Sequence, residues 1–373
     1  MTKNLIAAVN SSLANADTLT PNTLEESLLD NRSLLEKRLK SQLSLTAEHI
    51  DNDLVKSLIN QLLADFANND SALSDNTLKS LFIYWNVFEQ WCNEHNHVSL
   101  PASAATFIAY INDKKSVVKM NTLSQYRWAV SKIHLAAGLP SPSHTQKVMD
   151  IVGGIRKQKA RASEMVTQAS PFRSHHIDEL VSLWVNHQSP LECRNLAIMI
   201  TAYETMLRES ELARIELSHI TYHDDGRATL LIPFTKTNLS GEPDVVMLSR
   251  QCVEILERYL SHSINDSVYL FKKMAKNGNP ATQHNPISRF TIDRVFKQAY
   301  LSFCTHRPQL IRGISDWSGH SARVGACQDL LSAGYSVLEV QQAGRWSSSE
   351  MVYRYGRNIL AKESAMAQAR WSK

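Results

Sequence analysis

The 373-residue chain is long enough for two domains, and its 43% content of hydrophobic residues is enough for each to bury a core. No stretch reaches the roughly 18 uninterrupted apolar residues of a membrane-spanning helix, and the N-terminus lacks the apolar block of a secretory signal. The five cysteines, odd in number and widely spaced, indicate reduced thiols. We therefore expect a cytoplasmic protein. Its net charge of +4 alone does not identify a class of partner.

The first half of the chain has helical patterning throughout. Residues 1–70 are rich in leucine and in charges of both signs, which predicts a helical N-terminal extension. From Ser74 to residue 162 we expect further helices, including 103–112, 121–137 and 145–160, separated by breaks such as GLPSPS. The polar stretch 162–172 contains Pro171, and we place the boundary between two domains there.

Two basic clusters lie in this first half. Either they are surfaces that neutralise phosphates or they are ordinary solvated helix faces, and the charges alone leave both interpretations open. The clusters comprise Lys114, Lys115, Lys119, Arg127 and Lys132, and Lys147, Arg156, Lys157, Lys159 and Arg161.

The second half is predicted to be mostly helical with a small sheet. Helices are expected at 175–187 and 190–207, and then two β-rich runs within 228–249 surround a turn that carries Lys236. Helical patterns resume and continue to the end. The predicted fold class is therefore mainly α, with a small β-hairpin or sheet in the second domain.

Several cationic and polar side chains in the second half could bind a phosphate. Arg323 follows His320 by three residues in SGHSARVGA, which puts both on one helix face near the helix start, where anions are favoured. Arg208 offers a second planar donor. Each residue also has a structural explanation: Arg208 and Glu211 could form a helix ion pair, and His320 could cap its helix. Likewise, Lys236 could decorate a turn and Trp346 could fill the core.

The order and combination of these residues resemble the signature of the tyrosine site-specific recombinases, the phage-integrase family. The resemblance covers roughly residues 74–373. It is carried by Arg208, LARI (212–215), TKT (235–237), WSGHSARVGA (317–326), QAGRW (342–346) and YGRN (355–358). It implies that residues 71–162 are a SAM-like core-binding domain for DNA and that residues 163–373 are the catalytic domain.

The resemblance also implies a mechanism. Tyr355 would attack a DNA phosphate and form a 3′-phosphotyrosyl bond, and the released 5′-hydroxyl would attack the same linkage in a partner duplex. No metal, nucleotide or other cofactor is expected. Tyr353 is a rival nucleophile, but two residues on a helix lie about 200° apart, and the family spacing selects Tyr355.

The same resemblance implies roles for the other residues. Arg208 and Arg323 would clamp the phosphate, with Glu211 orienting Arg208. His320 and Trp346 would donate hydrogen bonds to the phosphate, and Lys236 would protonate the leaving 5′-oxygen. The chain departs from the family pattern at Arg345, where a glycine is usual; a further phosphate contact or an altered rate could follow.

The expected partner is double-stranded DNA with paired inverted arms, gripped by a C-shaped clamp. Lys79, Gln125, Arg289 and Arg294 match groove-facing positions. The C-terminal segment 358–371 is amphipathic, with Ile359, Leu360, Met366 and Trp371 as apolar candidates. By resemblance it docks on a neighbouring protomer and gives a homotetramer on two synapsed sites. The alternative is that it packs on its own domain.

Metal binding has little support in the sequence. Cys92, His95 and His97 lie close together, but a second ligand pair is not evident.

Three functions remain open. The first is a self-sufficient site-specific recombinase that needs no accessory proteins. The second is an integrase or telomere resolvase that needs them or makes hairpin ends. The third is a sequence-specific DNA-binding protein without catalysis.

Overall fold

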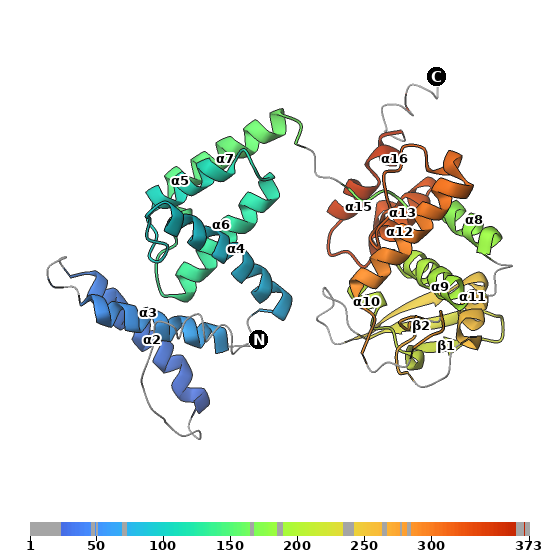
Figure 1. The fold of residues 1–373 in the computed structure, drawn as a ribbon, viewed down its shortest axis with the longest axis horizontal. Coiled ribbons are helices and arrows are strands. Elements are labelled where there is room, and N and C mark those ends of the chain that lie inside the picture. The colour runs from blue at the N-terminus through green and yellow to red at the C-terminus, as the bar shows by residue number, and fades with distance from the viewer. Residues whose placement is uncertain are drawn as a thin grey trace. The chain divides into compact units, whose positions relative to one another are not determined.

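The protein has a mostly helical fold with one small antiparallel sheet, as predicted (Figure 1). The computed structural model describes residues 24–45, 49, 51–68, 73–164, 168–184, 189–233, 242–262, 267–276, 278–281, 285–362 and 369. The chain divides into two compact units, residues 1–166 and 167–373. Within the described ranges, no helix is long and apolar enough to cross a membrane.

The first unit is entirely helical over its described residues. Its helices are α2 (Leu24–Leu43), α3 (Asn52–Asn68), α4 (Asp75–Glu94), α5 (Ala104–Lys114), α6 (Met120–Ala136), the 3₁₀ turn Pro142–His144 and α7 (Gln146–Arg161). The hydroxyls of Ser74 and Ser103 accept hydrogen bonds from the backbone at N3 and so cap α4 and α5. The core is aromatic: the Phe88 and Tyr110 rings lie 5.0 Å apart in an edge arrangement.

The helix pair α2 and α3 belongs to the body of the first unit. Leu39 and Leu62 are fully buried in a cluster that includes Ala137 and Leu139, just beyond the end of α6. Gly138 lies between them with φ +71°, and a Cβ there would come within 2.8 Å of the Leu62 Cδ1. The chain turns tightly there because glycine allows the left-handed conformation and the close approach.

The second unit surrounds a nearly fully buried helix. Its elements are α8 (Ser174–Trp184), α9 (Pro190–Thr205), α10 (Glu209–Leu212), the 3₁₀ turn Leu217–His219, β1 (Ile220–Tyr222), β2 (Ala228–Ile232), β3 (Asp244–Leu248), α11 (Arg250–Ser261), α12 (Arg289–His306), the 3₁₀ turn Pro308–Ile311, α13 (Ser321–Ser332), α14 (Val337–Ala343), α15 (Glu350–Tyr355) and α16 (Arg357–Lys362). Every residue of α9 from Cys193 to Ala202 is buried. This helix forms the centre of the core of the second unit.

The sheet has the order β1-β2-β3 with antiparallel neighbours. Strands β2 and β3 form the predicted hairpin, with Ala228 opposite Leu248 and Leu230 opposite Val246. Strand β1 was not predicted, because a run of three residues is too short to show a period-two pattern.

Helix α16 covers the described start of the predicted amphipathic segment. Gly356 ends α15, and α16 starts at the next residue. Ile359 and Leu360 pack against a cluster of their own unit that contains Tyr355. For these two residues the structure therefore shows packing on their own domain. Met366 and Trp371 lie outside the described residues.

Candidate active site

Four segments of the second unit meet in one buried cluster. The C-terminal end of α9, helix α13, the turn after α14 and helix α15 contribute to it. Its buried members are Met206, Val324, Ala326, Cys327, Leu331, Val340, Trp346, Val352 and Tyr355. The predicted residues Trp346 and Tyr355 therefore lie together, although Trp346 is in the turn after α14 and Tyr355 is at the end of α15.

Arg323 is only 2% exposed, and backbone carbonyls hold its guanidinium. Its Nη2 donates to the Gly344 carbonyl at 3.0 Å, and its Nη1 donates to the Met206 carbonyl. The guanidinium carbon lies 5.1 Å from the centre of the Trp346 ring. Burial, then the charges of Arg208 and Arg345, lower the pKa of Arg323 to about 10, so the group stays cationic at neutral pH. Because neutral carbonyls hold it, its positive charge remains available to an anion.

Arg208 is the N-cap of α10, not a residue within a helix. Its backbone N–H donates to the Glu211 Oε2 at 2.9 Å, and its Nη1 donates to the Glu211 Oε1 at 2.8 Å. The expected ion pair is therefore present, but as part of a cap that fixes both the backbone and the side chain of Arg208. The Arg208 side chain keeps 31% of its surface exposed, whereas that of Glu211 keeps 9%.

Tyr355 and His320 are in direct contact. The His320 Nε2 lies 2.6 Å from the Tyr355 hydroxyl, and the Trp346 ring lies edge-on to the tyrosine, with ring centres 5.6 Å apart. Burial raises the pKa of Tyr355, while Arg323 opposes that shift. Burial, followed by the charges of Arg323 and Arg208, lowers the pKa of His320 to about 4. At neutral pH the imidazole is therefore uncharged and, in the suitable tautomer, can accept a hydrogen bond from the phenol.

The two tyrosines of α15 are in opposite environments. Tyr353 is 57% exposed and Tyr355 is 6% exposed. Only Tyr355 contacts His320, as expected from the angle between positions i and i+2 on a helix.

The turn between α14 and Trp346 has a backbone conformation at position 345 that favours glycine. Arg345 has φ +51°, which is the left-handed region. Its Nη2 donates to the Thr205 carbonyl at the end of α9, and its Nη1 donates to the Ala343 carbonyl at 3.4 Å. At Gly344, a Cβ would lie 2.6 Å from the Trp346 ring. The extra phosphate contact that the sequence suggested for Arg345 therefore competes with contacts inside the protein.

The remaining predicted residues occupy different surroundings. Lys236 lies outside the described residues. Lys79 on α4 is exposed, Gln125 on α6 is half-buried, and Arg289 and Arg294 on α12 are exposed.

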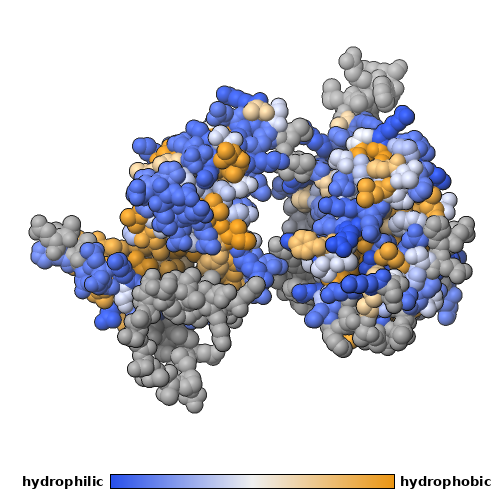
Figure 2. Space-filling view, in the orientation of Figure 1, coloured by the Kyte–Doolittle hydropathy of each residue, from blue (hydrophilic) through white to orange (hydrophobic). Residues whose placement is uncertain are grey.

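The predicted basic clusters are not uniform. Figure 2 shows a mostly hydrophilic surface with hydrophobic residues in scattered groups. Arg156 and Lys157 are exposed. The Lys159 Nζ instead donates to the Val118 carbonyl at 2.8 Å and to Glu164 at 2.6 Å, so its charge holds the end of α7 to the start of α6. Lys159 therefore does not fit the expected phosphate surface.

The histidines proposed as metal candidates stack on an indole. His95 and His97 lie parallel to the Trp91 ring, with centres 4.4 and 5.4 Å away. Among the residues that the structure covers, no group of three or more His, Cys, Asp or Glu side chains is arranged to hold a metal ion.

Comparison with known proteins gives the family. Residues 172–360 match the phage integrase family. The chain belongs to this family. It is 32% identical over 331 residues to the recombinase Cre of Escherichia phage P1, which covers 85% of this chain and 94% of Cre. An integrase/recombinase XerD homologue of Selenomonas ruminantium is 24% identical over 295 residues, covering 77% of this chain and 82% of the relative.

Solved structures of tyrosine recombinases share the fold. The Tn1549 transposon integrase in complex with circular intermediate DNA has a TM-score of 0.58 at 13% identity, covering 84% of this chain and 99% of that chain. The XerH recombinase bound to a difH substrate has a TM-score of 0.54 at 13% identity, covering 93% and 96%. The protein is a tyrosine recombinase, an enzyme that transfers DNA strands.

Proposed function

We propose that this tyrosine recombinase cuts and rejoins DNA at specific sites through a phosphodiester bond to Tyr355. The observation that carries the proposal is the 2.6 Å contact between the His320 Nε2 and the Tyr355 hydroxyl. Both side chains lie beside the buried Arg323 guanidinium, whose charge acts on each of them. A nucleophile in contact with a neutral base, next to a fixed cation, is suited to attack on a phosphate.

Two arginines would hold the phosphate. Arg208 and Arg323 each have their guanidinium fixed by contacts within the protein, so little reorganisation is needed when DNA binds. Two planar cations also match the additional negative charge of a pentavalent phosphorus. Trp346 would donate its indole N–H to a non-bridging oxygen.

The contact with Tyr355 supports the role of His320 in proton transfer, and the family resemblance supports that of Lys236. The Tyr355 oxygen forms a bond to phosphorus as the bond from phosphorus to the 5′-oxygen breaks. The phenol proton passes to His320, a different role from the phosphate hydrogen bond that the resemblance implies, and the 5′-oxygen takes a proton from Lys236. A 5′-hydroxyl of the partner duplex then reverses these steps. One phosphoester replaces another, so the exchange needs no ATP.

The proposed substrate is a duplex with paired inverted arms, bound without accessory proteins and recombined by a homotetramer on two synapsed sites. The similarity to Cre over 94% of its length supports this form of the proposal. Lys79, Gln125, Arg289 and Arg294 are the proposed contacts to the arms.

The decisive experiment is a search for the covalent adduct. The purified protein is incubated in excess EDTA with duplexes from its flanking genomic DNA, nicked near the candidate cleavage point. We expect a protease-sensitive protein–DNA adduct from the wild type and from Tyr353→Phe, but not from Tyr355→Phe. An adduct from Tyr355→Phe would show that another residue is the nucleophile, and a requirement for metal would indicate a nuclease.

A second measurement separates the remaining forms of the proposal. A self-sufficient enzyme recombines two sites as a purified protein, and cross-linking should trap four protomers on the synapsed DNA. An enzyme that needs accessory proteins forms the adduct but completes recombination only after cell extract is added. A DNA-binding protein without catalysis binds the arms and forms no adduct.

A further inference from the structure

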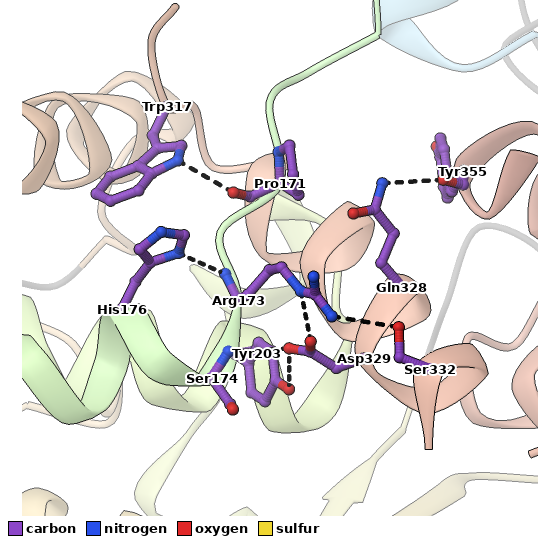
Figure 3. A network of polar contacts seen from close by, with 10 residues as sticks. All are labelled: Pro171, Arg173, Ser174, His176, Tyr203, Trp317, Gln328, Asp329, Ser332 and Tyr355. Atoms are coloured by element: carbon purple, nitrogen blue, oxygen red, sulfur yellow. Dashed lines mark hydrogen bonds and ion pairs between the residues drawn. The ribbon is translucent and has the colours of Figure 1, made fainter. Parts of the chain in front are cut away.

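The carbonyl of Tyr355 has an unusual set of hydrogen-bond partners. Tyr355 is the last residue of α15, where helix carbonyls lose their usual backbone donors. The Gln328 Nε2 donates to this carbonyl at 3.0 Å (Figure 3), and the Gln168 Nε2 reaches it at 3.5 Å. The backbone N–H groups of Ile359 and Leu360 instead donate to the Gly356 carbonyl. Side chains therefore fix the backbone at the nucleophile.

Gln328 lies on the same helix as the candidate phosphate ligands. Helix α13 has His320 as its N-cap and Arg323 in its first turn. The next residue after Tyr355 also lies against α13, because a Cβ on Gly356 would be only 2.0 Å from the Leu331 Cδ1. Helix α13 therefore carries Arg323 and also contacts the backbone at Tyr355.

Helix α13 is itself anchored by the residue after Gln328. The Asp329 carboxylate accepts hydrogen bonds from the Arg173 Nε at 2.6 Å, the Ser174 backbone N–H at 2.9 Å and the Tyr203 hydroxyl at 2.7 Å (Figure 3). These donors come from the start of α8 and from α9. A Cβ on Gly325 would overlap the Phe172 carbonyl oxygen, at 1.8 Å. Close packing and a three-donor carboxylate leave α13 little freedom to shift.

We propose that Gln328 is a positioning residue for the nucleophile. Its amide holds the Tyr355 backbone on α13, so that the hydroxyl is presented to a phosphate bound by Arg323 at the distance and angle that attack requires. This inference rests on the proposed role of Tyr355. Because a misplacement of about 1 Å can cost about a hundredfold in rate, loss of the Gln328 donor should slow cleavage by about tenfold to a hundredfold.

The test uses two substitutions close in size to glutamine, Gln328→Met and Gln328→Glu, and a larger one that keeps N–H donors, Gln328→Arg. Gln328→Met removes all polar contacts, and Gln328→Glu replaces the donor by a carboxylate that repels the carbonyl. Gln328→Arg retains N–H donors. The first two variants should form the covalent adduct about tenfold to a hundredfold more slowly in a single turnover at saturating enzyme, with an unchanged Kd for DNA. Gln328→Arg should recover most of the rate. Gln342→Met, at an exposed glutamine of α14, is the matched control and should keep the wild-type rate.

A substrate with sulfur in place of the bridging 5′-oxygen distinguishes a misplaced nucleophile from a damaged proton donor. A thiolate leaves without protonation, so this substrate should restore cleavage by Lys236→Ala but not by Gln328→Glu. Restoration of Gln328→Glu would overturn the inference, as would wild-type rates from Gln328→Met and Gln328→Glu proteins with unchanged melting temperatures. If instead Tyr355→Phe still forms the adduct, the proposed function fails first.

Discussion

The two units of the protein treat buried polar groups differently. Over its described residues the first unit buries Thr106, Ser131, His134, Ser141 and Ser143, none of which carries a permanent charge. The second unit buries two arginines and a lysine, Arg194, Arg323 and Lys272, each at most 5% exposed.

Under the proposed function, this difference would separate DNA binding from chemistry. Removing a cation from water is costly, and a protein compensates only with fixed polar partners. The first unit keeps an apolar, aromatic core and leaves cations such as Arg156 and Lys157 at the surface, where they can neutralise phosphates. In the proposed mechanism, burial of Arg323 is useful because a desolvated, immobile cation stabilises developing charge better than a mobile one.

The strongest test of this contrast compares two buried arginines of the second unit. Arg323→Ala should slow formation of the covalent adduct by about 10²–10³-fold, the usual effect of losing one transition-state donor. Arg194, which donates to the Asn195 side chain and the Lys272 carbonyl, is the control. Arg194→Ala should lower stability and leave the rate of the remaining folded enzyme near that of the wild type. Equal losses of binding and cleavage in Arg323→Ala would argue against a transition-state role.

A second test uses the buried histidine of each unit. Burial lowers the pKa of His176 to about 4, and it also lowers the pKa of His134. In the unfolded chain each histidine has a pKa near 6.5, so above that pH it is neutral in both states. As pH falls toward the folded pKa, protons bind to the unfolded state first, and the folded state loses stability. For His176 the loss should reach about 3 kcal/mol near pH 4. Urea unfolding of His176→Gln between pH 7 and 4 should show a flatter decline than the wild type; an equal decline would contradict the assignment.

A third test measures how the affinity for DNA depends on salt when Lys157 or Lys159 of the first unit is replaced. Lys157 is exposed, whereas Lys159 is engaged by Glu164. If Lys157 contacts a phosphate, Lys157→Gln should reduce the slope of log K against log salt by about 0.9. Lys159→Gln should leave that slope unchanged and lower the melting temperature instead. The reverse pattern would place the phosphate contact at Lys159.

The smallest expected effect concerns the backbone beside Trp346. Arg345→Gly and Arg345→Ala both remove the guanidinium that binds the Thr205 carbonyl, but only glycine relieves the left-handed conformation at φ +51°. The glycine variant should therefore be more stable than the alanine variant by about 1 kcal/mol. Equal unfolding free energies would show that the strain is absent in solution.

The sequence predicted the long elements because each is long enough to repeat its pattern. Helices α5, α6, α7 and α9 and the β2–β3 hairpin lie within a few residues of their expected bounds. Strand β1 and the break at Gly356 were missed because they are too short for a pattern.

The sequence predicted which residues form the candidate site, but it did not predict the contacts that position them. Arg208, His320, Arg323, Trp346 and Tyr355 were predicted from their resemblance to the family signature, and all five lie in the second unit. Their partners could not be found in this way. The Met206 carbonyl that receives Arg323 lies 117 residues away in the chain, and Gln328 lies 27 residues from Tyr355. Such contacts depend on tertiary packing and leave no local signal.

The contact between His320 and Tyr355 within one polypeptide has a genetic consequence. In the proposed mechanism each protomer would carry its own phosphate ligands and its own nucleophile, so two inactive proteins could not supply each other's missing group. A cell that expresses both Tyr355→Phe and Arg323→Ala should therefore behave as a null, because the two lesions do not complement each other. When co-expressed with the wild type, either mutant should be dominant-negative, because it should inactivate any assembly that requires several active protomers.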